Sequence, residues 1–91
     1  MPELELVLYT TSFCGACAAT RERIQAVTKA VGSRVTWREV NVAFAPDDAE
    51  RAGIGATPTV VLNRHERGEV MRAQGVPTIE QLLTAIAANI A

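Results

Sequence analysis

A strand, a helix and a second strand follow one another in the first 42 residues, and this order restricts the fold more than any other feature of the chain. Residues 3–10 contain a nearly continuous apolar run, which is typical of a strand buried on both faces. Residues 14–31 place apolar side chains three and four positions apart, which predicts an amphipathic helix. Residues 35–42 are rich in β-branched residues and predict another strand. Two strands joined through a helix are expected to run parallel, with a right-handed crossover.

The middle of the chain predicts a short helix and then a hairpin. Pro46 and the two aspartates after it suit the first turn of a helix, which we expect to continue over 49–52. Residues 59–62 and 69–74 predict two strands. The polar segment 63–68 between them predicts the turn of an antiparallel hairpin.

The chain ends in a predicted helix over 78–91. Thr78 and Gln81 form a capping-box pattern at its start, and apolar residues follow at helical spacing. The complete order is β-α-β-α-β-β-α. We therefore predict an α/β fold in which one mixed four-stranded sheet carries helices on both faces. At 91 residues, the whole chain (1–91) is expected to form a single domain.

Composition and charge argue against several classes of function. Nine lysines and arginines against ten aspartates and glutamates leave a net charge of −1, so the chain has no basic surplus with which to bind nucleic acid. Its apolar runs are too short to span a membrane, and its first residues lack the basic start of a secretory signal. We therefore expect a soluble cytoplasmic protein.

Cys14 and Cys17 are the only cysteines, and they stand where the first strand meets the first helix. Residues three apart on a first helical turn lie close enough for a disulfide. The unpaired N–H groups and the dipole at the helix N-terminus favour a thiolate at Cys14. Cys17 lies one turn further along, on the apolar stripe. This asymmetry predicts that Cys14 is exposed and attacks a disulfide, while Cys17 is covered and resolves the mixed disulfide.

Two other interpretations of the cysteine pair are open. A structural zinc site needs four ligands, and His65, expected on the hairpin turn, would add only a third, so a metal site would have to be shared between two chains. A purely structural disulfide would close too short a loop to add much stability. The position of the pair at a strand–helix junction favours redox chemistry instead, and we expect no metal and no organic cofactor.

Three parts of the sequence resemble the thioredoxin superfamily, and together they cover nearly the whole chain. Residues 13–17 (FCGAC) resemble the Trp-Cys-Gly-Pro-Cys motif of thioredoxins. Residues 41–42 and 53–59 (GIGATPT) resemble the segment that leads into the family's cis-proline. Residues 67–70, continuing through Gly75 into the last helix, resemble the C-terminal end of the family's fold.

The resemblance implies a site and a reaction. It implies a cis peptide bond between Thr57 and Pro58 facing the disulfide, whereas the position of Pro58 at a strand start, taken alone, favours a trans bond. It implies that Cys14 and Cys17 reduce protein disulfides, with disulfide-containing client proteins as substrates and a thioredoxin-reductase-like protein as electron donor. We expect a monomer, with a substrate groove lined by Phe13, Gly15, Ala16, Thr57, Pro58 and Gly75.

Departures from the thioredoxin pattern leave alternatives open. The buried acid that thioredoxins place six residues before the first cysteine falls on Leu8, so the proton relay to Cys17 is absent or carried by another group. Residues 7–10 (VLYT) look more like a glutaredoxin, and a glutathione-coupled, glutaredoxin-type reductase is the second interpretation. However, residues 75–78 (GVPT) replace the Gly-Gly and acidic pair with which glutaredoxins hold glutathione. A non-catalytic binding or metal-carrier module with this fold is the third.

Overall fold

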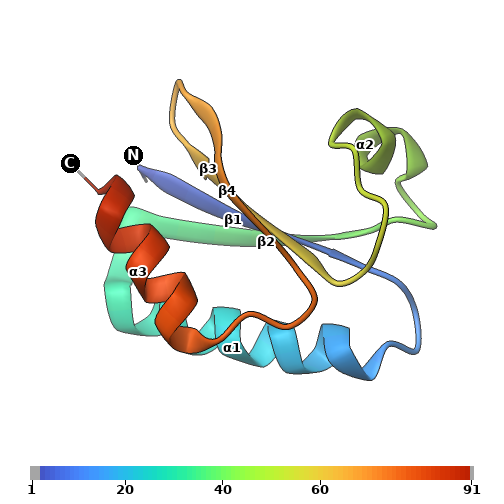
Figure 1. Ribbon diagram of the computed structural model, residues 1–91, viewed down its shortest axis with the longest axis horizontal. Helices are drawn as coiled ribbons and strands as arrows, with labels where there is room; N and C mark the ends of the chain where they lie inside the picture. The colour runs from blue at the N-terminus through green and yellow to red at the C-terminus, as the bar shows by residue number, and fades with distance from the viewer. Residues whose placement is uncertain (1–2, 91) are drawn as a thin grey trace.

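The computed structural model describes residues 3–90 and contains one mixed sheet with helices against both faces (Figure 1). The strand order is β2-β1-β3-β4. β1 runs parallel to β2 and antiparallel to β3, and β3 runs antiparallel to β4. The predicted fold class and element order are confirmed. Along the chain, the elements are β1 (Leu4–Thr10), α1 (Gly15–Val31), a 3₁₀ turn (Gly32–Arg34), β2 (Val35–Asn41), α2 (Pro46–Arg51), β3 (Thr59–Arg64), β4 (Gly68–Gln74) and α3 (Ile79–Asn89).

β1 lies inside the sheet because its side chains are apolar on both faces. Leu4, Leu6 and Leu8 pack on the face that α1 and α3 cover, and Val7 and Tyr9 pack on the face of α2. All five are buried. Burial on both faces matches the nearly continuous apolar run, since an alternating pattern would have left one face to water.

The larger core lies between the sheet and the helices α1 and α3, which share one face (Figure 1). α1 contributes Ile24 and Val27, and α3 contributes Leu82 and Ile86. The capping box predicted at Thr78 is present, since the Thr78 hydroxyl accepts a hydrogen bond from the Gln81 backbone N–H and the Gln81 side chain accepts one from Thr78 N–H. These contacts fix where α3 begins.

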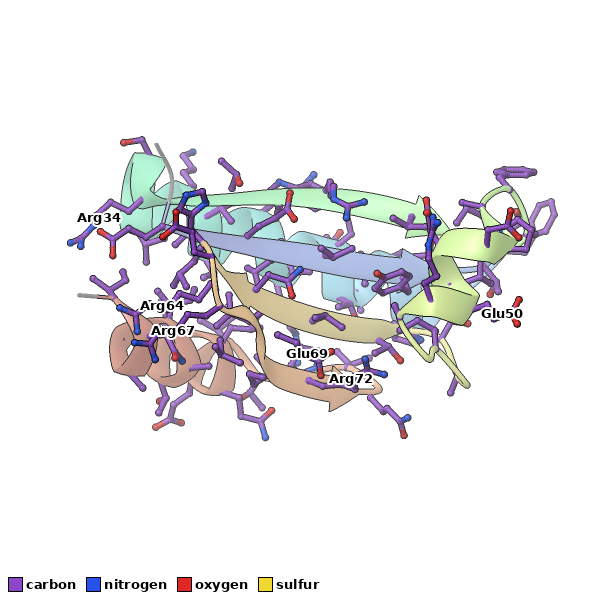
Figure 2. All side chains as sticks on the ribbon, turned by 90° about the horizontal axis from the view of Figure 1, so that it is seen from above. Arg34, Glu50, Arg64, Arg67, Glu69 and Arg72 are labelled. Atoms are coloured by element: carbon purple, nitrogen blue, oxygen red, sulfur yellow. A yellow bond between two sulfur atoms is a disulfide. The ribbon has the colours of Figure 1, made fainter. Side chains whose placement is uncertain are left out.

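α2 covers one end of the opposite face, over a smaller cluster that includes Tyr9 and Val61. An arginine of β4 holds the end of this helix. Arg72 donates hydrogen bonds to the carbonyl oxygens of Ala52 (2.5 Å) and Gly53 (3.1 Å). It also pairs with Glu69 at 2.7 Å, and Figure 2 shows the two side chains together on β4. The arginine therefore joins the outer strand to the loop after α2.

A second ion pair joins α1 to β2 near the end of β1. Arg21 donates two hydrogen bonds to the Glu39 carboxylate, at 2.6 and 2.7 Å, and the Thr10 hydroxyl donates a third at 2.9 Å. The hydrogen bonds from the Arg21 guanidinium are the main reason why the pKa of the Glu39 carboxyl lies below its usual range. Glu39 therefore stays ionised in the folded protein near neutral pH.

Several element ends differ from the prediction. The predicted antiparallel hairpin is present, but its turn is shorter than the predicted 63–68 and covers 65–67, because Asn63 and Arg64 extend β3 by pairing with the first residues of β1. α2 spans Pro46–Arg51, so it begins at the proline expected in its first turn and ends one residue before the predicted 52. The last helix ends at Asn89, and Ala91 lies outside the described residues. No helix within residues 3–90 is long and apolar enough to cross a membrane.

Two isoleucines test how the helices pack. Ile24 of α1 is 0% exposed and Ile79 of α3 is 44% exposed. We expect Ile24→Ala to lower the free energy of unfolding by about 2–5 kcal/mol, because the missing side chain leaves a cavity in the core. The matched variant Ile79→Ala is expected to lower it by about 1 kcal/mol or less. Urea denaturation of both variants measures the difference. Equal losses would contradict the orientation of α1.

The Arg21–Glu39 pair predicts a pH-dependent stability. Because the fold lowers the pKa of Glu39, the pair stabilises the protein above the ordinary carboxyl range and loses this effect as the pH falls through the lowered pKa. Both side chains keep roughly a third of their surface exposed (37% and 29%), so solvent screening limits the effect of Glu39→Gln to about 0.5–1 kcal/mol at neutral pH.

Thermal unfolding of Glu39→Gln and wild type across pH 3–7 would measure this effect. Glu22→Gln, which removes an exposed carboxylate from α1, the helix that carries Arg21, is the control. The stability difference between Glu39→Gln and wild type should shrink toward acid pH. A difference that stays constant with pH would mean that the carboxylate charge does not contribute.

Candidate active site

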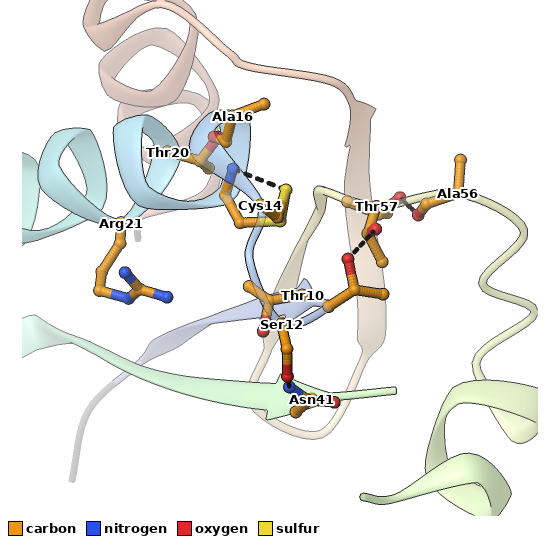
Figure 3. Close-up of a disulfide and its surroundings, with 12 residues drawn as sticks. Thr10, Ser12, Cys14, Ala16, Thr20, Arg21, Asn41, Ala56 and Thr57 are labelled. Carbon is orange, nitrogen blue, oxygen red and sulfur yellow. Dashed lines mark hydrogen bonds between the residues drawn. A yellow bond between two sulfur atoms is a disulfide. The ribbon is translucent and has the colours of Figure 1, made fainter. Parts of the chain in front are cut away.

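Cys14 and Cys17 form a disulfide at the N-terminus of α1 (Figure 3), and their Cα atoms are 5.1 Å apart. Cys14 is the N-cap residue, with an extended backbone, and its Sγ accepts a hydrogen bond from the backbone N–H of Cys17 at 3.1 Å. The sulfur thus satisfies one of the N–H groups that a helix leaves unpaired at its start. The same position favours a thiolate after reduction, because this N–H group and the helix dipole stabilise negative charge.

The two sulfur positions differ in access. Cys17 is 1% exposed and belongs to the buried stripe of α1. Cys14 was predicted to be exposed and is half-buried. Its Sγ accepts the hydrogen bond from the Cys17 backbone N–H at the start of α1. The predicted asymmetry holds in direction, because a client disulfide can reach Cys14 and has no comparable access to Cys17.

Phe13 precedes the disulfide and points its ring into solvent. Its side chain is fully exposed, and its φ of 57° lies in the left-handed region that bulky residues rarely adopt. Backbone strain of this kind concentrates at functional sites. The strained turn places an apolar ring next to Cys14 and outside the core, exposed to solvent.

The loop before β3 faces the disulfide across the site (Figure 3). The Thr57–Pro58 peptide bond is cis, as the resemblance implied, so the trans bond favoured by position alone is wrong. The Thr57 hydroxyl lies 3.2 Å from the Thr11 hydroxyl, a hydrogen bond that joins this loop to the segment before Cys14. The cis bond therefore lies in a loop that this hydrogen bond connects to the cysteine-bearing segment.

A third loop meets the same place. Gly75 donates its backbone N–H to the carbonyl oxygen of Pro58 at 2.9 Å. Its φ of 81° is one that a residue with a side chain rarely adopts. Gly15 and Ala16, the first residues of α1, are exposed between the cysteines. The structure thus brings together the loops that carry the residues predicted to line the groove. The Thr11–Thr57 and Gly75–Pro58 hydrogen bonds join these loops directly.

Sequence reasoning missed the side chains that hold these loops. Thr11 contacts Thr57, and the Asn41 side-chain amide donates to the Ser12 hydroxyl at 3.3 Å. Beside them lies an open cavity of about 190 Å³. The only available signal was the hydroxyl-bearing segment 10–12 before the cysteine motif, and nothing in that segment indicates which residues it contacts. The cavity is lined by Thr11, Val42, Ile54, Gly55, Ala56 and Thr57.

The position of the acid found in thioredoxins carries no charge here. Leu8 is fully buried there, in the larger core. Glu39 is its register partner on β2, but Arg21 and Thr10 bind its carboxylate. A carboxylate whose pKa is lowered is a poor proton acceptor near neutral pH. We therefore assign Glu39 no proton-transfer step.

His65 lies in the hairpin turn after β3, where its backbone N–H donates to the carbonyl oxygen of Glu3, just before the start of β1. Within residues 3–90, no group of three or more histidine, cysteine, aspartate or glutamate side chains could hold a metal ion. The functional groups at the site are thus the two sulfurs, the hydroxyls and the backbone groups around them.

Comparison with known proteins agrees with this geometry. A family model described as thioredoxin matches residues 2–88. The thioredoxin of Methanocaldococcus jannaschii is 33% identical over 86 residues, covering 94% of this chain and 95% of the relative. Among solved structures, thioredoxin-2 of the malaria parasite has a TM-score of 0.87 at 16% identity, over 94% of this chain and 82% of that one.

The X-ray structure of Fasciola hepatica thioredoxin superimposes with a TM-score of 0.84 at 24% identity, over 97% of this chain and 82% of that one. At these identities the two structures support the fold alone. The family match and the archaeal relative reach further, because they span nearly the whole chain, including both cysteines. With its vicinal cysteine pair at the start of α1, this chain belongs to the thioredoxin family and is a thiol–disulfide oxidoreductase.

Proposed function

We propose that this protein reduces disulfides in other proteins, with Cys14 as the nucleophile and Cys17 as the resolving thiol. The observation that carries the proposal is the placement of the two sulfurs. Cys14 Sγ sits at the helix N-cap with a backbone N–H directed at it, and Cys17 is buried one turn behind. The first arrangement favours a thiolate and the second protects a thiol until the first has reacted.

The reaction takes two exchange steps. The Cys14 thiolate attacks one sulfur of the client disulfide, so a Cys14–client disulfide forms and the other client sulfur leaves as a thiolate. Cys17 then attacks Cys14 Sγ, and its proton passes to the departing client sulfur. The Cys14–Cys17 disulfide forms, and two electrons have moved from the cysteine pair to the client.

A new cycle needs two electrons from outside the protein. Family membership supports a reductase that recognises this fold as the donor. Reduced glutathione is the other donor class, and it would make the protein a glutaredoxin-type reductase. The same protein with a higher reduction potential would donate disulfides instead of reducing them.

The roles of the two cysteines are tested by trapping the first intermediate. Reduced Cys17→Ser, incubated with insulin, is expected to accumulate a mixed disulfide, because no second thiol can release the client. Mass spectrometry under non-reducing conditions measures the adduct and its attachment to Cys14. The matched variant Cys14→Ser should form little adduct, since Cys17 is buried. Equal trapping by both variants, or trapping at Cys17 only, would reverse the assignment.

The direction of the reaction is tested by the reduction potential of the Cys14–Cys17 pair. We expect a value near or below about −250 mV, typical of a reductant that a reductase supplies. Thiol alkylation and mass measurement after equilibration in thiol–disulfide buffers would give it. A value above about −200 mV would favour glutathione coupling or disulfide donation and would refute the proposed direction.

A further inference from the structure

The segments that surround the disulfide carry no charged side chain. Residues 10–20, 40–46, 52–63 and 73–79 contain no lysine, arginine, histidine, aspartate or glutamate. The first of these segments holds the cysteines, the third holds the cis peptide bond and the fourth holds Gly75. Figure 2 shows Arg34, Arg64 and Arg67 at the end of the sheet opposite to α2. The face that these four segments form around the disulfide therefore carries no charged side chain of its own.

Two arginines next to this face are paired with opposite charges, whereas Arg23 donates to the carbonyl oxygen of Pro77 at 2.8 Å and Asp47 stands in the first turn of α2. Arg21 binds Glu39, and Arg72 binds Glu69 while also donating to two carbonyl oxygens. Each pair contributes little net field at the distance of a bound client, because its two charges nearly cancel. These two ion pairs thus give no reason for a client of either charge to be preferred.

Two aromatic rings stand out of this neutral face. Phe13 is fully exposed, and Phe44, in the loop between β2 and α2, is 83% exposed. Phe44 donates its backbone N–H to the carbonyl oxygen of Asn41 at 3.1 Å, and the Asn41 side chain binds Ser12, the neighbour of Phe13. The two rings are therefore carried by loops that one asparagine joins. Exposed apolar groups gathered at one site mark interaction surfaces.

The open cavity of about 190 Å³ lies between these loops and the cis-proline loop. Its lining is aliphatic and hydroxyl-bearing, with Val42 and Ile54 as the larger apolar side chains. Val42 is two residues before Phe44, so the cavity and the ring belong to the same loop. A charged side chain placed there would lose its hydration without gaining a partner, whereas an apolar one would be removed from water.

We propose that Phe44 is a specificity-determining residue, and that the clients of this protein present a disulfide flanked by uncharged aliphatic or aromatic residues. One flanking side chain occupies the cavity and another packs on the Phe44 ring. This inference rests on the proposed function, since it names the substrate class of the same site. Selectivity arises from the cost of bringing charges onto a neutral face as well as from apolar contact.

The experiment separates docking from chemistry by using the reduced protein in single turnovers, so no reductase is needed. Three disulfides are compared: 2-hydroxyethyl disulfide, which has almost no docking surface, and two synthetic peptides of equal length, each closed by one disulfide. One peptide carries leucine, valine and phenylalanine around its cysteines, and the other carries aspartate and lysine. We expect the apolar peptide to react about tenfold faster than the charged one, with little dependence on salt.

Substitutions at Phe44 test the residue itself. Phe44→Glu and Phe44→Lys are expected to lower the rate for the apolar peptide, relative to 2-hydroxyethyl disulfide, about tenfold, because either charge opposes an apolar contact. Phe44→Leu should retain most of this ratio. Ser33→Glu, an exposed charge beyond the far end of the 17-residue α1, roughly 25 Å away, is the matched control and should leave the ratio at the wild-type value.

The outcomes separate the two proposals. No reaction with 2-hydroxyethyl disulfide or with either peptide would overturn the proposed function, and the inference with it. If the protein reacts with 2-hydroxyethyl disulfide and reduces the two peptides at equal rates, the inference alone is overturned. Opposite effects of Phe44→Glu and Phe44→Lys would also overturn it, because they would show that charge and not apolar contact selects the client. Thermal unfolding of each variant checks that the exposed substitution leaves the fold intact.

Discussion

The fold depends on the burial of β1 on both faces. Leu4, Leu6 and Leu8 need a cover of helices on one side, and Val7 and Tyr9 need a cover on the other. Such a strand must also pair along both edges, because its backbone groups have no water to bind. β2 and β3 satisfy these groups. The C-terminal end of the same strand then leads directly into the loop that carries Cys14, so the core positions the redox pair.

The elements that sequence patterns predicted well are those decided by local chemistry. Apolar runs and helical spacing identified the strands and α1, because burial selects residue types every two or every three to four positions. The cysteine pair was located correctly for the same reason, since a strand end and a helix start fix the position of Cys14. The end of β3 was missed, because Asn63 and Arg64 are polar and owe their strand conformation to pairing with β1.

Contacts between distant segments were beyond such patterns. Nothing local to Thr57 or Pro58 indicates a cis bond, which entered only through the family resemblance. The bonds from Gly75 to Pro58 and from Asn41 to Ser12 join residues far apart along the chain. Phe44 was overlooked, because an apolar residue in a loop is ordinarily assigned to packing, and only the structure shows its ring in solvent.

The hydrogen bonds among the loops at the disulfide affect which partner, the protein or its client, loses conformational freedom on binding. Thr11 holds Thr57, Ser12 holds Asn41 and Gly75 holds Pro58 before any client arrives. A preorganised site loses little conformational freedom when a complex forms, so the loss falls on the client, at about 1–2 kcal/mol for each residue ordered. A client whose disulfide already lies in an extended or partly unfolded segment does not have to unfold locally before it binds. The folded state of the client, rather than a movement of the enzyme, would then govern which disulfides are reduced.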